Sequence, residues 1–165
     1  MKKFLNIILI VFFAFATFLS CEKTESYSPI PEISFTKYRV YDTAYSSGFN
    51  QRNVAIFFKF VDGDGDIGDT TSGVNNLFFS RYEQRNGEFI NVDSTLVDSI
   101  RYRIPFAEIM RREGQNKTLK GSIKIDVSEL VIKYDTIKYD FYITDRAGNK
   151  SNVASTTPIT GLKKQ

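Results

Sequence analysis

Three segments of this chain alternate apolar and polar residues with a period of two, and no other feature limits its possible folds as strongly. They are residues 54–60, 119–127 and 136–144. In the last of them, Ile or an aromatic residue alternates with Lys, Asp or Tyr. A β-strand points successive side chains to opposite faces, so each segment is expected to be a half-buried strand of an antiparallel sheet. The pattern therefore predicts an all-β domain.

Weaker forms of the same pattern raise the expected number of strands to about eight. They occur at residues 33–41, 77–84, 88–92, 97–104 and 152–159. Turn signals separate the segments, and Asn86-Gly87 predicts a hairpin. Residues 105–114 are expected to form one or two helical turns, with Pro105 at the start and Gly114 just past the end. Seven or eight short strands predict an antiparallel β-sandwich of the immunoglobulin or fibronectin type, and a small barrel is the alternative.

The N-terminal residues 1–20 have the organisation of a secretory signal peptide. Lys2 and Lys3 precede an uncharged, mostly apolar run from Phe4 to Leu19, which is the charged start and hydrophobic centre of such a signal. A retained transmembrane anchor is the alternative. The run is near the lower limit of length for a helix that spans a bilayer, so a cleaved signal is the favoured interpretation.

The segment Phe18-Leu19-Ser20-Cys21 resembles the lipobox of bacterial lipoproteins, in which apolar residues and a small residue precede the cysteine that receives diacylglycerol. Phe18 occupies a position where Leu is usual. Cys21 is the only cysteine, so the domain cannot contain a disulfide. The resemblance implies cleavage before Cys21, a covalent lipid on Cys21 and attachment to a membrane. An ordinary secretory signal followed by an unmodified cysteine is the alternative.

Residues 21–31 are predicted to be a lipidated, flexible tether that leads to a single globular domain at residues 32–165. The tether is polar and contains Pro29 and Pro31, which favour an extended path. The chain carries 22 Lys and Arg against 19 Asp and Glu. Two of those lysines leave with the signal peptide, so the mature chain is close to neutral and no nucleic-acid partner is expected.

Directly after the first alternating segment, the stretch VDGDGDIGD brings four carboxylates close together along the chain. They belong to Asp62, Asp64, Asp66 and Asp69. Like charges about 4 Å apart repel by about 4 kcal/mol at an effective dielectric constant near 20, so a compact arrangement needs a cation. Calcium is the natural candidate because it takes oxygen ligands. The loop is not an EF-hand, since the required glycine and glutamate positions hold Ile67 and Gly73.

A second acidic turn, DRAGN at residues 145–149, precedes the last expected strand. In an immunoglobulin-type sandwich, the loop after the second strand and the loop between the sixth and seventh strands lie at the same pole. With the strands assigned in that order, Asp145 and Asn149 are expected to approach the aspartates of the first loop and to contribute to a calcium site. The alternative is that both loops are solvated turns, because tight turns favour Asp, Asn and Gly.

Few catalytic chemistries are compatible with this composition. The chain has no histidine, which removes the commonest general base and the commonest zinc ligand. No serine lies in a GxSxG pattern, and a hydrolase that uses paired carboxylates is formally compatible. Eight aromatic residues are candidates for a binding face, although core or cross-strand packing is the favoured interpretation. They are Tyr38, Tyr41, Tyr45, Phe49, Phe78, Tyr82, Phe89 and Tyr142.

Four features together resemble small lipoproteins of Bacteroidetes-type bacteria that carry an immunoglobulin-like domain. They are FLSC, a tether with prolines, FKFVDGDGDIG after an early strand, and YDFYITDRAGNKSN near the end. The resemblance implies an address in the outer membrane, facing the periplasm or the outside. The expected function is a non-catalytic binding or accessory module with an unidentified protein or glycan partner. A purely structural, calcium-stabilised envelope protein is the alternative, and a carboxylate-dependent hydrolase is the least favoured.

Overall fold

The computed structural model describes most of the predicted domain. The described residues are 26–46, 48, 50–68, 74–92, 100–105, 118–129 and 133–163. The predicted signal peptide, Cys21, Asp69 and residues 106–114 of the predicted helical turns lie outside these ranges. Within the described part of the chain, no helix is long and apolar enough to cross a membrane.

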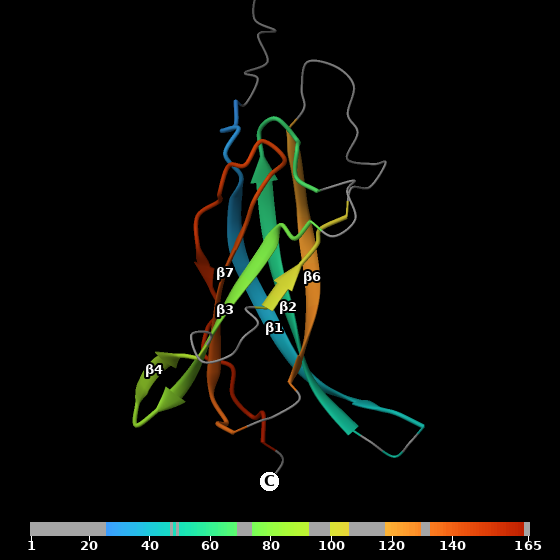
Figure 1. Cartoon of the computed structure of the whole chain (residues 1–165), viewed down its shortest axis with the longest axis vertical. Helices are drawn as coiled ribbons and strands as arrows, with labels where there is room; N and C mark the ends of the chain where they lie inside the picture. The colour runs from blue at the N-terminus through green and yellow to red at the C-terminus, as the bar shows by residue number, and fades with distance from the viewer. Residues whose placement is uncertain are drawn as a thin grey trace, which may run out of the picture.

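Two antiparallel sheets pack face to face as a β-sandwich, which confirms the prediction of an all-β domain (Figure 1). The first sheet has the order β1-β2-β6, with β1 at Glu32–Ala44, β2 at Asn50–Asp62 and β6 at Leu119–Glu129. The second sheet has the order β4-β3-β7-β8, and β5 also pairs with β3. Its strands are β3 at Leu77–Arg85, β4 at Glu88–Asn91, β5 at Ile100–Tyr102, β7 at Ile137–Ile143 and β8 at Ala154–Ser155.

The core lies between the sheets and consists of the alternating apolar positions that the sequence pattern predicts. On β7 every second side chain is fully buried, namely Ile137, Tyr139, Phe141 and Ile143. The rings of Phe58 on β2 and Phe141 on β7 lie 5.0 Å apart and join the two sheets. Burial of one such side chain stabilises a fold by about 1.5–3 kcal/mol. Alternation in sequence therefore becomes a continuous apolar layer in space.

The last strand is shorter than the sequence predicts. A strand was expected at residues 152–159, but β8 contains only Ala154 and Ser155. Beyond it, the backbone N–H of Tyr139 donates to the Oγ1 atom of Thr156 at 3.1 Å instead of to a backbone carbonyl. Pro158 has no N–H to donate. The regular ladder is therefore interrupted here, and it resumes at Ile159, which exchanges two backbone hydrogen bonds with Ile137.

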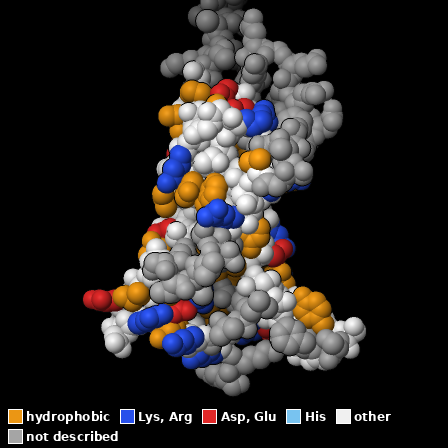
Figure 2. All heavy atoms as spheres, viewed as in Figure 1, with side chains coloured by type: hydrophobic (Ala, Val, Ile, Leu, Met, Phe, Trp, Pro, Cys, Tyr) orange, Lys and Arg blue, Asp and Glu red, His pale blue; other side chains and the backbone are white. Residues whose placement is uncertain are grey.

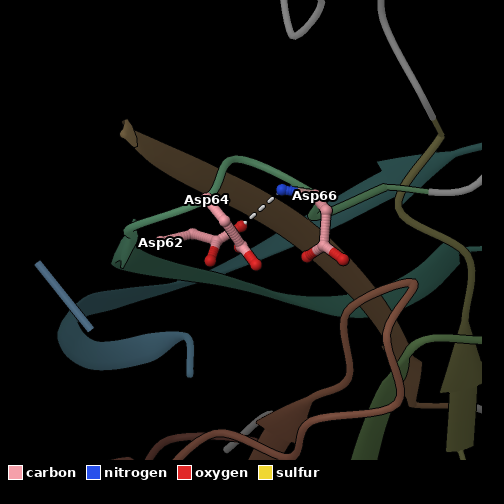
Figure 3. Close-up of side chains that lie close together, drawn as sticks. All are labelled: Asp62, Asp64 and Asp66. Atoms are coloured by element: carbon pink, nitrogen blue, oxygen red, sulfur yellow. Dashed lines mark hydrogen bonds between the residues drawn. The ribbon is translucent and has the colours of Figure 1, made fainter. Parts of the chain in front are cut away.

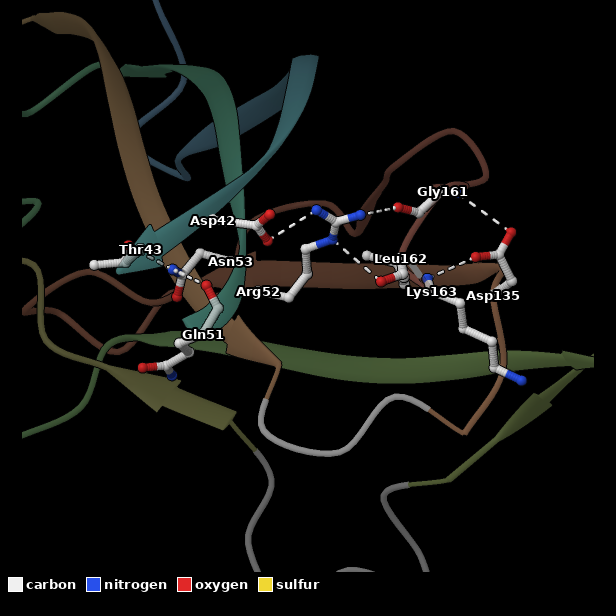
Figure 4. A network of polar contacts seen from close by, with 9 residues as sticks. All are labelled: Asp42, Thr43, Gln51, Arg52, Asn53, Asp135, Gly161, Leu162 and Lys163. Atoms are coloured by element: carbon white, nitrogen blue, oxygen red, sulfur yellow. Dashed lines mark hydrogen bonds and ion pairs between the residues drawn. The ribbon is translucent and has the colours of Figure 1, made fainter. Parts of the chain in front are cut away.

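Arg52, near the start of β2, fastens the C-terminal segment to the sandwich (Figure 4). Its Nη1 atom donates to Asp42 Oδ1 at 2.8 Å. Its Nε and Nη2 atoms donate to the carbonyl oxygens of Leu162 at 3.1 Å and Gly161 at 2.8 Å. The Leu162 side chain is buried in the core. The guanidinium thus holds a buried residue in place from outside the core.

The two ends of the sandwich carry different segments (Figure 1). One end holds the loop at residues 62–68, the turn at residues 145–149 and the incoming residues 26–31; we call it the acidic pole. The hairpins β1–β2 and β3–β4 and the C-terminal segment lie at the opposite end. Segments far apart in sequence therefore meet at the acidic pole.

Replacing Arg52 with Ala is expected to lower the free energy of unfolding by about 1–3 kcal/mol, because it removes several hydrogen bonds from a partly buried guanidinium. Urea denaturation of residues 22–165 measures the change. The exposed Arg39 of β1 provides the control, and Arg39→Ala should stay within about 0.5 kcal/mol of the parent. Equal stability of the two variants would contradict an anchoring role for Arg52.

Candidate functional site

Three carboxylates gather at the acidic pole where β2 ends. One ligand oxygen from each of Asp62, Asp64 and Asp66 lies within 4.8 Å of the others. Figure 3 shows the three carboxylates on the same side of the loop. Asp62 is 0% exposed. Among the described residues, the Oδ1 atoms of all three are buried without a hydrogen-bond partner.

Asp62 organises the loop that follows it. Its Oδ2 atom accepts hydrogen bonds from the backbone N–H of Asp66 at 2.8 Å and of Ile67 at 3.0 Å. The side chain of Ile67 is fully buried in the core. The loop is therefore held by a carboxylate at one point and by an apolar side chain at the next. These two constraints fix where the carboxylates of Asp64 and Asp66 can lie.

Gly63 brings the incoming N-terminal segment against this loop. Its N–H donates to the carbonyl oxygen of Ser28 at 2.8 Å. A Cβ atom at residue 63 would lie 2.4 Å from the carbonyl oxygens of Ser28 and Tyr27, so the approach requires glycine. The Tyr27 hydroxyl also contacts the Nζ atom of Lys120 on β6. The described end of the predicted tether therefore packs on the acidic pole.

The turn at residues 145–149 meets the loop through Asp66. The Ala147 N–H donates to Asp66 Oδ2 at 3.0 Å, and the Arg146 N–H donates to the Asp66 carbonyl oxygen at 3.3 Å. The Arg146 Nη1 atom donates to the carbonyl oxygen of Gly68 at 2.9 Å. Sequence analysis did not assign a role to Arg146, which adds a positive charge beside the carboxylates.

Asp145 and Asn149 bond to each other within their own turn. Asp145 Oδ1 accepts from the backbone N–H of Asn149 at 2.7 Å, and Oδ2 accepts from the Asn149 Nδ2 atom at 2.9 Å. Asp145 is buried, at 7% exposure. Of the predicted metal ligands, the structure groups Asp62, Asp64 and Asp66, while Asp69 lies outside the described residues.

Burial and mutual repulsion perturb the carboxylates of this group. The pKa of the Asp62 carboxyl is raised to about 7, first because it is buried and also because Asp64 and Asp66 lie beside it. The pKa of Asp66 is raised by burial and then by the charges of Asp145 and Asp64. The arrangement therefore favours either a bound proton or a cation. Its donors are oxygen atoms, which suit calcium or magnesium.

The outer face of the five-stranded sheet carries half-exposed aromatic side chains. Phe78 on β3 lies opposite Tyr142 on β7, and their rings stack 5.0 Å apart at 17°. The Lys150 Nζ atom lies 3.8 Å from the centre of the Tyr142 ring, and the Lys138 Nζ atom lies 4.8 Å from that of Tyr82. Figure 2 shows hydrophobic side chains next to Lys and Arg side chains on the face toward the viewer.

A polar row separates the aromatic positions on this face. Ser80 lies between Phe78 and Tyr82 on β3 and is opposite Asp140 on β7. Asp140 accepts a hydrogen bond from the Ser155 hydroxyl at 2.6 Å. It also forms an ion pair with Lys138, two residues earlier on β7. We call this surface the aromatic face. Its members are Phe78, Ser80, Tyr82, Phe89, Lys138, Asp140, Tyr142, Lys150 and Ser155.

Comparisons of the chain with protein-family models, with curated proteins and with solved structures found no significant match. Its function is therefore inferred from the acidic pole and the aromatic face.

Without divalent cations, the protein is expected to lose stability as the pH rises from about 4 to about 7. The Asp62 carboxyl has a pKa of about 7 in the folded state, above its ordinary value of 3.8. The folded state therefore binds this proton more tightly, and its stabilising effect disappears once the folded carboxyl ionises. Thermal melting in chelator across this pH range measures the effect.

Asp62→Asn is the matched control for this pH dependence, because an amide oxygen can still accept the two backbone hydrogen bonds but cannot titrate. Its melting temperature should fall less over the same pH range. An equal fall in the parent and the variant would assign the effect to other groups.

Proposed function

We propose that the mature chain is a lipid-anchored, non-catalytic module of the bacterial envelope that binds an acidic glycan. The observation that carries the binding role is the aromatic face, where half-exposed rings stand next to lysines. The lipid anchor is supported by the lipobox-like segment that ends at Cys21. The following paragraphs give the support for each part.

The aromatic face carries more outward aromatic rings than the described outer face of the other sheet, where Tyr41 on β1 and Phe57 on β2 are half-exposed. On β6 the outward side chains belong to Lys, Ser and Asp, as expected for a face in water. On β3 and β7 the corresponding outward positions include Phe78, Tyr82 and Tyr142. Half-exposed aromatic rings are not needed to close the core, which is already filled from the inward positions. Their higher number on this outer face favours a contact with a ligand.

The shape and charge of this face fit a linear, acidic sugar polymer. Phe78 and Tyr82 are four residues apart on one strand, which corresponds to roughly 13 Å along the sheet. Aromatic rings stack on the C–H faces of sugars, and Ser80 supplies a hydroxyl between them. Lys150 provides a positive charge for carboxylate, phosphate or sulfate groups, while Lys138 shares its charge with Asp140.

The strand order supports an immunoglobulin-like or fibronectin-like type of sandwich. The sheets β1-β2-β6 and β4-β3-β7-β8 correspond to strands A-B-E and C′-C-F-G of those folds. We infer this type for the domain.

In such a domain the aromatic face is a long side of the sandwich, while the tether enters at one end. Anchoring through residues 21–31 would therefore leave the aromatic face accessible to envelope polymers.

Binding is tested with residues 22–165 by gel electrophoresis in the presence of polygalacturonate, an acidic polysaccharide, or dextran, a neutral one. Polygalacturonate should retard the protein and dextran should not. The double variant Tyr82→Ala, Tyr142→Ala should bind about tenfold more weakly, because both rings are lost. Lys150→Gln should weaken binding and reduce its sensitivity to salt.

Tyr41→Ala is the control, because Tyr41 lies on the other sheet, and this variant should bind like the parent. Circular dichroism verifies that each variant is folded. Equal retardation of the parent and the double variant, or no retardation of either, would overturn the glycan proposal and favour a structural role.

The lipid anchor is tested by producing the full chain in a bacterium with a lipoprotein pathway and measuring its mass. The parent should carry diacylglycerol on residue 21 and partition into detergent. Cys21→Ala should lack both properties, because no thiol remains to be modified. A parent protein released without lipid would show that residues 1–20 act as an ordinary secretory signal.

A further inference from the structure

We propose that Asp62, Asp64 and Asp66 bind a calcium ion that ties the incoming N-terminal segment and both loops together at the acidic pole. This inference is independent of the glycan proposal, because it concerns a different part of the molecule. The proximity of three carboxylates alone would not carry it, since acidic turns are often solvated. A second observation concerns the individual oxygen atoms.

Only one of the two carboxylate oxygens of the buried Asp62 has hydrogen-bond partners in the described structure. Its Oδ2 atom accepts from two backbone N–H groups, while its Oδ1 atom is buried without a partner among the described residues. The residue as a whole is 0% exposed. Buried polar atoms without a partner are rare in native proteins and call for an explanation such as a bound ion.

Asp66 repeats this arrangement. Its Oδ2 atom is held by the Ala147 N–H at 3.0 Å, and its Oδ1 atom is buried without a partner in the described part of the chain. In both residues the backbone fixes one oxygen and leaves the other available to the group formed with Asp64. Side chains that are fixed before the ion arrives lose little conformational freedom on binding.

The chemistry of the donors selects calcium. The three ligands are carboxylate oxygens, whereas zinc prefers nitrogen and sulfur and the chain has no histidine. Magnesium demands a regular octahedron and keeps most of its water. Calcium accepts an irregular set of oxygens and can complete its shell with backbone carbonyls and water. A loop whose positions are fixed by Ile67 and by the turn at residues 145–149 suits the more tolerant ion.

The charge balance at the pole favours a divalent cation. Asp145 adds a fourth negative charge near the group, at the start of the turn whose Ala147 N–H donates to Asp66 at 3.0 Å. Arg146 adds one positive charge beside the group, and its Nη1 atom donates to the carbonyl of Gly68. Lys120 contacts Tyr27. The carboxylates thus exceed the positive charges placed beside them, and a bound ion would offset this excess.

The ion would act on three segments at once. Gly63, between two of the ligands, donates to Ser28 of the incoming chain. Asp66, the third ligand, accepts from Ala147 of the second turn. Calcium would therefore fix the position of residues 26–31 relative to the sandwich. In the lipidated protein, this contact would fix the orientation of the domain relative to the lipid anchor.

The test is a calcium titration of residues 22–165, which contain every described core residue from Ile33 to Leu162. Isothermal calorimetry should give one site with a dissociation constant of roughly 10⁻⁶ to 10⁻³ M, and the melting temperature should rise with calcium. Asp64→Asn should weaken binding at least about tenfold. Its fold should be retained in chelator, because the Oδ1 atom of Asp64 accepts no hydrogen bond in the described structure.

Asp126→Asn is the matched control, because Asp126 is an exposed carboxylate of β6, and it should bind calcium like the parent. Magnesium at the same concentration should produce a smaller rise in melting temperature. Absence of heat and of thermal stabilisation up to millimolar calcium would overturn the proposal. Equal binding by the parent and Asp64→Asn would do the same, because it would indicate adventitious binding elsewhere.

Hydrogen exchange distinguishes calcium binding itself from its proposed effect as a clamp, which is to hold residues 26–31 and the turn at residues 145–149 against the loop. Calcium should slow exchange of the Gly63 and Ala147 amides, which bridge the loop to its two neighbours. The Thr156 amide, bonded to Tyr139 in the middle of the other sheet, should be unaffected. Calcium binding without slower exchange at Gly63 would overturn the clamp while leaving the site in place.

Discussion

The packing of Phe58 against Phe141 is the contact on which the rest of the molecule depends. The only cysteine is outside the described domain, so apolar burial must hold the sheets together. The strands that carry these two rings also lead into the two loops of the acidic pole. β2 ends at Asp62, and β7 ends just before the turn at residues 145–149. Contact between the strands in the core therefore sets the distance between the loops.

The burial of Asp62 follows from the same alternation that builds the core. Val54, Ile56, Phe58 and Phe60 face inward on β2, and Asp62 is the next inward position. A carboxylate there loses its contact with water, and this raises its pKa. Hydrogen bonds from the loop satisfy only one of its oxygens. The burial of this carboxylate could have been predicted from the sequence, because Asp62 continues the inward positions of the alternating segment.

Other features could not be predicted, because they depend on interactions that periodicity does not encode. The Asn86-Gly87 turn was predictable, since both residues adopt the positive φ angles (52° and 89°) that a tight hairpin needs. The outward direction of Phe78 was not, because it lies within the run Leu77-Phe78-Phe79, where either parity is possible. Asp145 is held within its own turn, because the backbone N–H and the Nδ2 atom of Asn149 donate to its two carboxylate oxygens. Short-range bonds therefore decided where this carboxylate lies.

Oxygen atoms from separate chain segments lie close together at both ends of the sandwich, but the positively charged groups beside them differ. At each end, chain segments leave the sheets and bring oxygen atoms close together. At one end Arg52 supplies its guanidinium to two carbonyls and a carboxylate. At the acidic pole the oxygens are carboxylates, and the Arg146 Nη1 atom donates to the carbonyl of Gly68. The protein thus provides its own cation at one end, and we propose that a calcium ion from solution takes this role at the other.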